Sequence, residues 1–277
     1  MKIKFVLISL FWSFCLTAFA TAQNSQLKIL DKPKPALHEV SDPQAEAVIQ
    51  KAIKNLGGEK YLNVKTQIGR GRFSVIRDGA VISFQTFTDV IVYPDKERTD
   101  FKGSGVRSAQ VNIGDTGWVY DGDQEAIREQ TPEQIENFRR GIRVSLDNLL
   151  RGHWKGDAEL TYVGRRQATL GKRNDVLKLI YKDGMTVEFE FTSDEAIPVK
   201  AIYSREMADG STVKEEDRYA QFHEFGGIGT PFIIDRTTDG KPTSRINYES
   251  IEFNKKIPDS VFAKPKDAKS LKKGIKL

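Results

Sequence analysis

The stretch VLKLIYKDGMTVEFEF, residues 176–191, decides the fold class of this chain. Val187, Phe189 and Phe191 alternate with glutamates, which is the two-residue period of a β-strand with one apolar and one polar face. An Asp-Gly pair at residues 183–184 separates this run from the apolar run before it. Because aspartate and glycine tolerate the backbone angles of tight turns, the stretch predicts a β-hairpin.

The same pattern recurs along most of the chain. Gly71, Phe73 and Val75 alternate with polar residues, and three more Asp-Gly pairs begin at residues 78, 209 and 239. Further strands are expected at residues 81–93, 110–120, 159–164, 176–182, 199–206, 212–222, 231–237 and 245–253. Hairpin after hairpin predicts an antiparallel meander, so we expect a mainly β protein with few helices, of the α+β class.

A first helix is expected after residue 42. Ser41 or Asp42 can cap its free N–H groups, and Pro43 suits the first turn, where a missing donor costs nothing. One helical face then repeats through Ala45, Val48, Ile49, Ala52, Ile53 and Leu56. Two glycines at residues 57–58 end the pattern.

A second helical passage is expected at residues 131–152. Thr131 and Gln134 have the spacing of a capping box. An apolar stripe follows at Ile135, Phe138, Ile142, Leu146, Leu149 and Leu150. Gly152 closes it, and Gly141 is a point where it can divide into two helices. We expect this passage to act as a lid, with a permanent plug as the alternative.

Residues 1–22 have the three parts of a secretory signal peptide: a charged start, an apolar stretch and a small-residue cleavage site, so we expect cleavage before Gln23. A retained membrane anchor is the alternative. Residues 23–42 are polar and proline-rich and predict an extended lead-in. The only cysteine, Cys15, lies in the signal peptide, so the mature chain is expected to lack disulfides, thiol catalysis and a lipid anchor. We therefore expect a soluble periplasmic protein.

The charge balance and the C-terminal end narrow the partners. Removal of the signal peptide takes two lysines and lowers the net charge from +5 to +3, which is too mild and dispersed to indicate a nucleic-acid partner. Residues 264–277 carry six lysines and one acid, Asp267. They predict a disordered basic tail, with weak contact to an anionic membrane surface as the alternative. Residues 43–263 are expected to form one domain.

The sequence shows no catalytic or metal-binding motif. His38, His153 and His223 lie at no metal-ligand spacing, and no nucleophile elbow or phosphate-binding glycine loop is present. Asp121 and Asp123 flank a glycine in a pattern that fits a turn better than a calcium loop. We expect no cofactor, no metal and no enzymatic activity. A hydrolase whose carboxylates meet only after folding stays as an alternative.

An excess of large apolar side chains on the strands suggests a cavity. A long curved antiparallel sheet must close on itself or have its concave face covered by helices. A loose cover leaves an apolar cleft for acyl chains, whereas a tight cover leaves ordinary core. The candidate cavity residues are Phe73, Val75, Phe84, Trp118, Leu146, Leu149, Val187, Phe189 and Phe191.

Four stretches together resemble the outer-membrane lipoprotein-sorting proteins of the LolA-like family: the capped first helix, GWVYDG at 117–122, NLLRG at 148–152, and the strand–turn–strand order of 222–265. The resemblance implies an incomplete, curved antiparallel β-barrel with helices over an apolar cavity. It implies a non-enzymatic periplasmic carrier of lipid or acylated lipoprotein, or a regulatory or scaffolding protein that senses a lipid or an inner- or outer-membrane envelope protein. It also implies a lid-holding arginine, for which Arg70 and Arg72 are nearest by position.

Overall fold

The computed structural model describes residues 41–169, 171–207, 209–275 and 277. The predicted signal peptide and residues 23–40 of the predicted lead-in lie outside the described residues. No helix of the described part is both long and apolar enough to cross a membrane.

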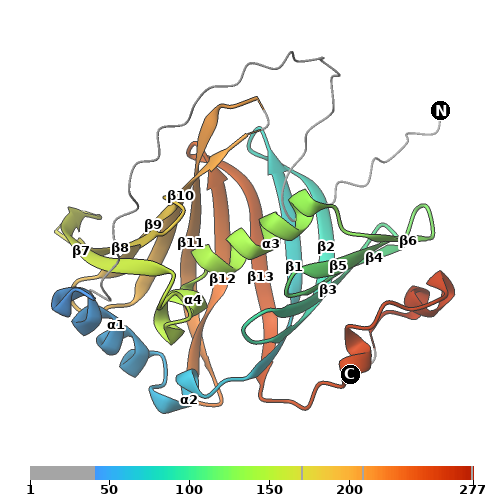
Figure 1. Ribbon diagram of the computed structural model, residues 1–277, viewed down its shortest axis with the longest axis horizontal. Helices are drawn as coiled ribbons and strands as arrows, with labels where there is room; N and C mark the ends of the chain where they lie inside the picture. The colour runs from blue at the N-terminus through green and yellow to red at the C-terminus, as the bar shows by residue number, and fades with distance from the viewer. Residues whose placement is uncertain (1–40, 170, 208, 276) are drawn as a thin grey trace.

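In this part of the chain, thirteen antiparallel strands form one open, strongly curved sheet (Figure 1). The first meander comprises β1 (Thr66–Arg77), β2 (Ala80–Val92), β3 (Lys96–Gly103), β4 (Val106–Ile113), β5 (Thr116–Asp121) and β6 (Ala126–Glu129). The second comprises β7 (Ala158–Gln167), β8 (Arg173–Tyr181), β9 (Thr186–Thr192), β10 (Pro198–Glu206), β11 (Thr212–Phe225), β12 (Ile228–Thr238) and β13 (Lys241–Phe253). β1 pairs with β13, which joins the meanders and leaves β6 and β7 as the two edges. The predicted fold class is confirmed.

The sequence missed two strands and one turn. Residues 110–120, expected as one strand, are divided between β4 and β5 by a turn in which Gly114 has φ of 53°. β3 and β6 were not predicted. The sequence pattern did not indicate β3 because this strand lacks an alternation of apolar residues. It buries polar side chains instead, among them Arg98, Thr99 and Asp100.

The first predicted helix is confirmed as α1 (Pro43–Asn55), and a one-turn helix, α2 (Glu59–Leu62), follows it. The Asp42 carboxylate accepts hydrogen bonds from the N–H groups of Gln44 and Ala45, which satisfies donors that the first turn leaves free. The buried face of α1 is the predicted one, with Ala45, Ile49, Ala52 and Ile53 in the core.

The second helical passage is two helices, α3 (Pro132–Val144) and α4 (Leu146–Arg151). The capping box of Thr131 and Gln134 is present. The break lies at Ser145, which has extended backbone and caps α4 through the N–H of Asn148, and not at Gly141. Because this passage links the edge strands β6 and β7, it has to cross the sheet. Figure 1 shows α3 lying across its concave face.

One core lies under α1 and α4. Their apolar faces pack on the inner side of β7–β10, where Val187, Phe189 and Phe191 are fully buried. Full burial of such side chains stabilises a fold by about 1.5–3 kcal/mol each. This half of the concave face is therefore filled.

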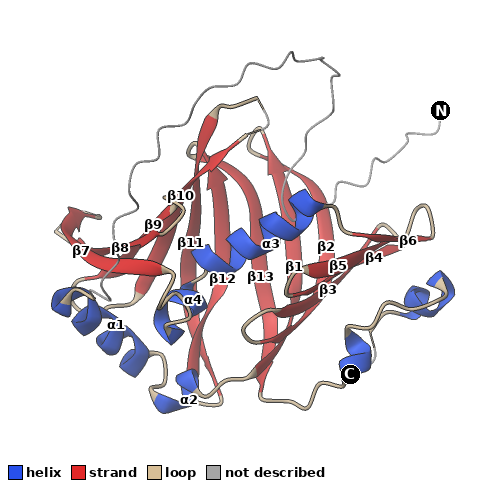
Figure 2. Ribbon diagram, in the orientation of Figure 1, coloured by secondary structure: helices blue, strands red, loops and turns tan. Residues whose placement is uncertain are grey.

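A second core lies on the opposite face of the first meander. Two 3₁₀ segments, η1 (Asp259–Val261) and η2 (Ala268–Lys273), follow β13 on the β3–β5 side (Figure 2). Phe262 and Leu271 pack there with Trp118, whose indole N–H donates to the Phe262 carbonyl at 2.9 Å.

The C-terminal residues thus differ from the expected disordered tail. The Ile275 N–H donates to the buried Asp100 carboxylate at 2.9 Å, and Lys272 pairs with Glu125 at 2.7 Å. The expectation of a disordered tail was based only on the lysines of this segment. The apolar residues between them, Leu271 above all, supply the packing.

Candidate functional site

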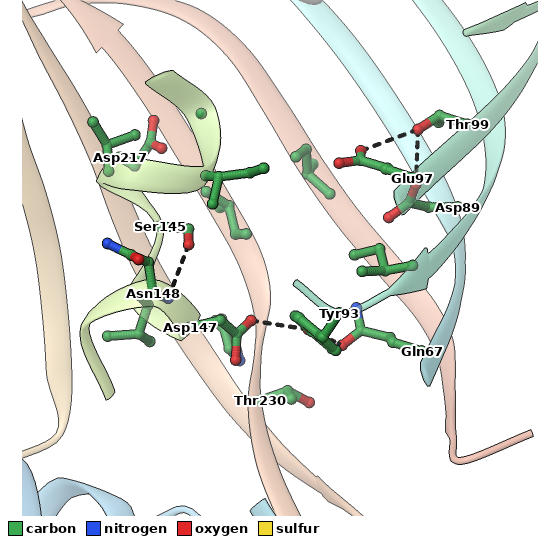
Figure 3. A pocket seen from close by; sticks show the side chains of 18 of the residues that line it. Gln67, Asp89, Tyr93, Glu97, Thr99, Ser145, Asp147, Asn148, Asp217 and Thr230 are labelled. Atoms are coloured by element: carbon green, nitrogen blue, oxygen red, sulfur yellow. Dashed lines mark hydrogen bonds between the residues drawn. The ribbon is translucent and has the colours of Figure 1, made fainter. Parts of the chain in front are cut away.

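A cavity of about 270 Å³ lies between the α3–α4 passage and the inner face of the first meander (Figure 3). Strands β11–β13 complete its wall. The volume is close to the lower end of the range for small-molecule pockets, roughly 300–1,000 Å³. It exists because α1 and α4 fill only the β7–β10 half of the concave face, while the other half is bridged by α3.

One part of the lining is apolar and largely aromatic. The side chains come from five strands and from the α3–α4 passage, and they are Phe73, Phe87, Phe101, Ile234, Ile246, Phe138, Ile142 and Leu146. Phe73 and Phe101 pack with ring centroids 5.8 Å apart. Such a wall can receive an acyl chain or another apolar group.

A second part of the lining is a network around Arg151 of α4. Its guanidinium lies 4.5 Å from the ring centroids of both Tyr61 and Tyr93 and donates to the Asp147 carboxylate at 2.9 Å. The hydroxyls of Tyr61 and Tyr93 donate to the same carboxylate at 2.7 and 3.0 Å. Burial, then the negative charge of Asp147, raises the pKa of each of these tyrosines well above its usual value. The network therefore fixes α4 to α2 and to the end of β2.

A third part consists of two carboxyl groups from neighbouring strands. Asp89 of β2 lies opposite Thr99 of β3, and Glu97 shares the inward face with Thr99 because it lies two residues away. The Thr99 hydroxyl lies 2.7 Å from Asp89 Oδ1 and 3.3 Å from Glu97 Oε1 (Figure 3). Burial raises the pKa of both carboxyl groups, and the charge of Glu97 raises that of Asp89 further. The pair therefore retains a proton to higher pH than free carboxyls do.

Across the cavity, Asp217 of β11 and Arg236 of β12 are register partners and form an ion pair of 3.3 Å. Burial raises the pKa of Asp217, and the guanidinium of Arg236 opposes that effect. His153 also lines the cavity, and burial followed by the charge of Arg151 lowers its pKa, which favours the neutral imidazole.

The structure brings only some of the predicted cavity residues to the cavity. Phe73 and Leu146 line it, and Val75 packs beside Phe73 in the adjoining cluster. Leu149, Val187, Phe189 and Phe191 lie instead in the core under α1 and α4, because that half of the concave face is filled.

Two further predicted residues face elsewhere. Trp118 points to the opposite side of the sheet, where the C-terminal segment covers it. Phe84 lies near the β1–β2 turn and is 53% exposed. Arg70 and Arg72 are also off the cavity: they pair with Glu252 and Glu249 on partly exposed positions.

The polar lining was missed by sequence reasoning. Asp89 and Glu97 sit in stretches that look like ordinary charged strand, and only the pairing of β2 with β3 brings them together. Asp147 and Arg151 are spaced four residues apart on a helix, which was the one available signal. In the described part of the chain, no group of three or more metal-ligating side chains is present.

Comparison with known proteins supports the fold alone. No protein-family model matches the sequence, and no curated protein sequence matches it. Among solved structures, a DUF1329 family protein from Desulfovibrio piger aligns with a TM-score of 0.58 at 13% identity, over 79% of this chain and 97% of that one. A LolA superfamily protein from Nitrosomonas europaea aligns with a TM-score of 0.53 at 15% identity, over 79% and 97%. The LolA-like fold expected from the sequence is thereby confirmed.

Proposed function

We propose that this chain is an exported, periplasmic binding protein that takes the apolar chain of an amphiphile into the cavity beneath α3 and carries or senses it without chemical change. The proposal rests on the position of α3, which lies across the concave face of the sheet. The passage between the two sheet edges spans a cavity whose nearest wall is aromatic and aliphatic. The LolA-like fold is consistent with lipid or acylated lipoprotein as the cargo.

The two helices of the passage differ in how they are held, which supports a lid. α4 is fixed by the Arg151 network and by Asn148, whose amide donates to the Tyr181 hydroxyl at 2.7 Å. In α3 the buried Asn137 Nδ2 and Arg143 Nε atoms have no hydrogen-bond partner among the described residues, and the helix is held at its end by the other guanidinium N–H groups of Arg143, which donate to the partly exposed Asp183 at 2.6 and 2.9 Å. Such atoms lower the cost of leaving the closed position, since water can satisfy them when α3 moves. In this proposal α3 opens about Ser145 while α4 stays in place.

Native mass spectrometry tests the proposal. The mature protein would be released from the periplasm of expressing cells by osmotic shock and sprayed without detergent. We expect one amphiphile molecule bound to each protein molecule. Organic extraction should remove this amphiphile, and addition of a monoacylglycerol should restore a one-to-one complex. Apoprotein alone, together with no uptake of the monoacylglycerol, would remove the proposal. Release of cleaved products during incubation would instead favour a hydrolase that uses Asp89 and Glu97.

A second candidate function follows from the β1–β2 hairpin. Val81, Ile82 and Phe84 are exposed there, Val81 by 60%, and exposed apolar groups that gather on one hairpin indicate a binding surface. They favour a regulatory or scaffolding protein that contacts an envelope protein. Crosslinking in cells should then yield one dominant protein partner, lost on Phe84→Ser and independent of bound lipid.

A further inference from the structure

We propose that the amphiphile's headgroup is a hydrogen-bond donor, a polyol or a primary ammonium, held by the acceptor-rich part of the cavity, and that carboxylate and phosphate headgroups are disfavoured. This inference rests on the proposed function and names the ligand class for the same site.

The lining of the cavity carries more carboxyl groups than cationic groups. Asp89, Glu97 and Asp217 face a single guanidinium, that of Arg236, which acts on both Glu97 and Asp217. The other buried arginine of the lining, Arg151, is already bonded to the Asp147 carboxylate at 2.9 Å. An anionic headgroup in this cavity would therefore face more carboxyl groups than cationic groups.

The carboxyl pair of Asp89 and Glu97 lies where little water reaches it. Asp89 is 6% exposed and Glu97 lies beside it, so little water screens a charge placed against them. Lys96 also lines the cavity, but its ammonium is partly exposed and lies 3.6 Å from the Asp259 carboxylate. Like charges brought together in such a site repel each other strongly, whereas an N–H or O–H donor is stabilised.

The wall of the cavity also contains an unsatisfied polar atom. The Thr230 hydroxyl of β12 lines the same cavity (Figure 3), is buried, and has no hydrogen-bond partner in the described part of the chain. Buried polar atoms of native proteins are nearly always paired, so an orphan in a cavity wall marks a place where a bound molecule can supply the partner. A polyol offers several hydroxyls to such a wall.

The protonation of the carboxyl pair agrees with this assignment. The carboxyl groups of Asp89 and Glu97 meet at the Thr99 hydroxyl, and burial raises the pKa of both, so the pair retains a proton to higher pH than free carboxyl groups do. A bound hydroxyl or ammonium group can donate to those carboxyl oxygens of the pair that carry no proton. A carboxylate or phosphate cannot donate in its charged form.

Calorimetric titration with four ligands of equal chain length tests the inference: dodecyl glucoside, dodecylamine, dodecanoate and dodecyl phosphate, each below its micelle concentration. We expect the glucoside or the amine to bind about tenfold or more tightly than either anion, and the better of the two identifies the headgroup. An anion that binds as tightly as both donors overturns the inference while leaving the proposed function intact. If none of the four binds, the proposed function itself fails.

Substitutions test which residues discriminate between donor and anionic headgroups. Glu97→Gln, alone or with Asp89→Asn, should narrow the donor-over-anion preference by about fivefold or more, because each change removes an acidic group of the wall. Glu249→Gln is the matched control, since Glu249 pairs with Arg72 outside the cavity and its loss should leave the preference unchanged. Equal effects of Glu97→Gln and Glu249→Gln would contradict the assignment. Circular dichroism of each variant confirms that it is folded.

Discussion

The guanidinium of Arg151 bonds to the carboxylate of Asp147 at 2.9 Å while its faces lie against the rings of Tyr61 and Tyr93. Arg151 also donates to the carbonyl of Val64 at 3.1 Å. This pair ties the short helix α4 to the start of β1 and the end of β2, so it sets one boundary of the cavity and gives α3 a fixed base.

Asp147→Ala should therefore cost much more stability than removal of a surface acid. The side chain of Arg151 is 5% exposed, and a buried cation that loses its partner costs about 3 kcal/mol in free energy of unfolding. Glu252→Ala is the matched control: it removes the carboxylate partner of Arg70, which is 40% exposed, and should cost about 1 kcal/mol or less. Urea unfolding measures both, and equal losses would show that the network does not fix α4.

Asp89→Asn should change the pH dependence of stability. Folding raises the pKa of Asp89, so the native state holds that proton more tightly than the unfolded state. The free energy of unfolding of the wild type should then fall as pH rises from the unfolded pKa of about 4 through the raised native pKa. The variant lacks this loss, so its urea midpoint should rise relative to that of the wild type as the pH is raised above about 4. Parallel pH profiles would contradict the burial of this carboxyl.

Leu146→Asp and Phe189→Asp should have different effects, because the first residue lines the cavity and the second lies in the filled core. Leu146 is partly buried and lines the cavity, so a carboxylate there should weaken amphiphile binding by about tenfold or more. The sheet should stay folded. Phe189→Asp places the same charge in the filled half of the concave face, where the side chain is fully buried, and should cost at least about 4 kcal/mol. Binding titration and urea unfolding of both variants check this. Global unfolding of Leu146→Asp would mean that the passage plugs the sheet permanently.

Leu271→Ala should destabilise the protein by about 2–3 kcal/mol, because it opens a cavity in the second core beside Trp118. Lys273→Ala, in the same 3₁₀ segment, is the control and should change the free energy of unfolding by about 0.5 kcal/mol or less. Thermal or urea unfolding distinguishes them. Equal, negligible effects would restore the expectation of a disordered tail.

The limits of sequence reasoning here have a physical cause. Periodicity and caps predicted α1, the capping box of α3 and most strands, since these depend on neighbours in the sequence. Periodicity cannot show which face of a curved sheet is covered. Phe189 and Trp118 were both predicted at the cavity, yet α1 covers the first and the C-terminal segment the second. Periodicity did not predict β3 because both of its faces carry polar side chains. Glu97 and Thr99 face the cavity. Arg98 and Asp100, on the other face, contact the C-terminal segment.

Amide hydrogen exchange of the mature protein, with and without saturating dodecyl glucoside, tests the central claim most directly: that the cavity under α3 binds an amphiphile and that α3 closes over it. The claim predicts that ligand slows exchange in Pro132–Val144, the α3 helix, by about tenfold or more, while Thr186–Thr192 of the filled core stays equally slow in both states. Exchange in α3 that is already slow without ligand and does not change with it would contradict the claim.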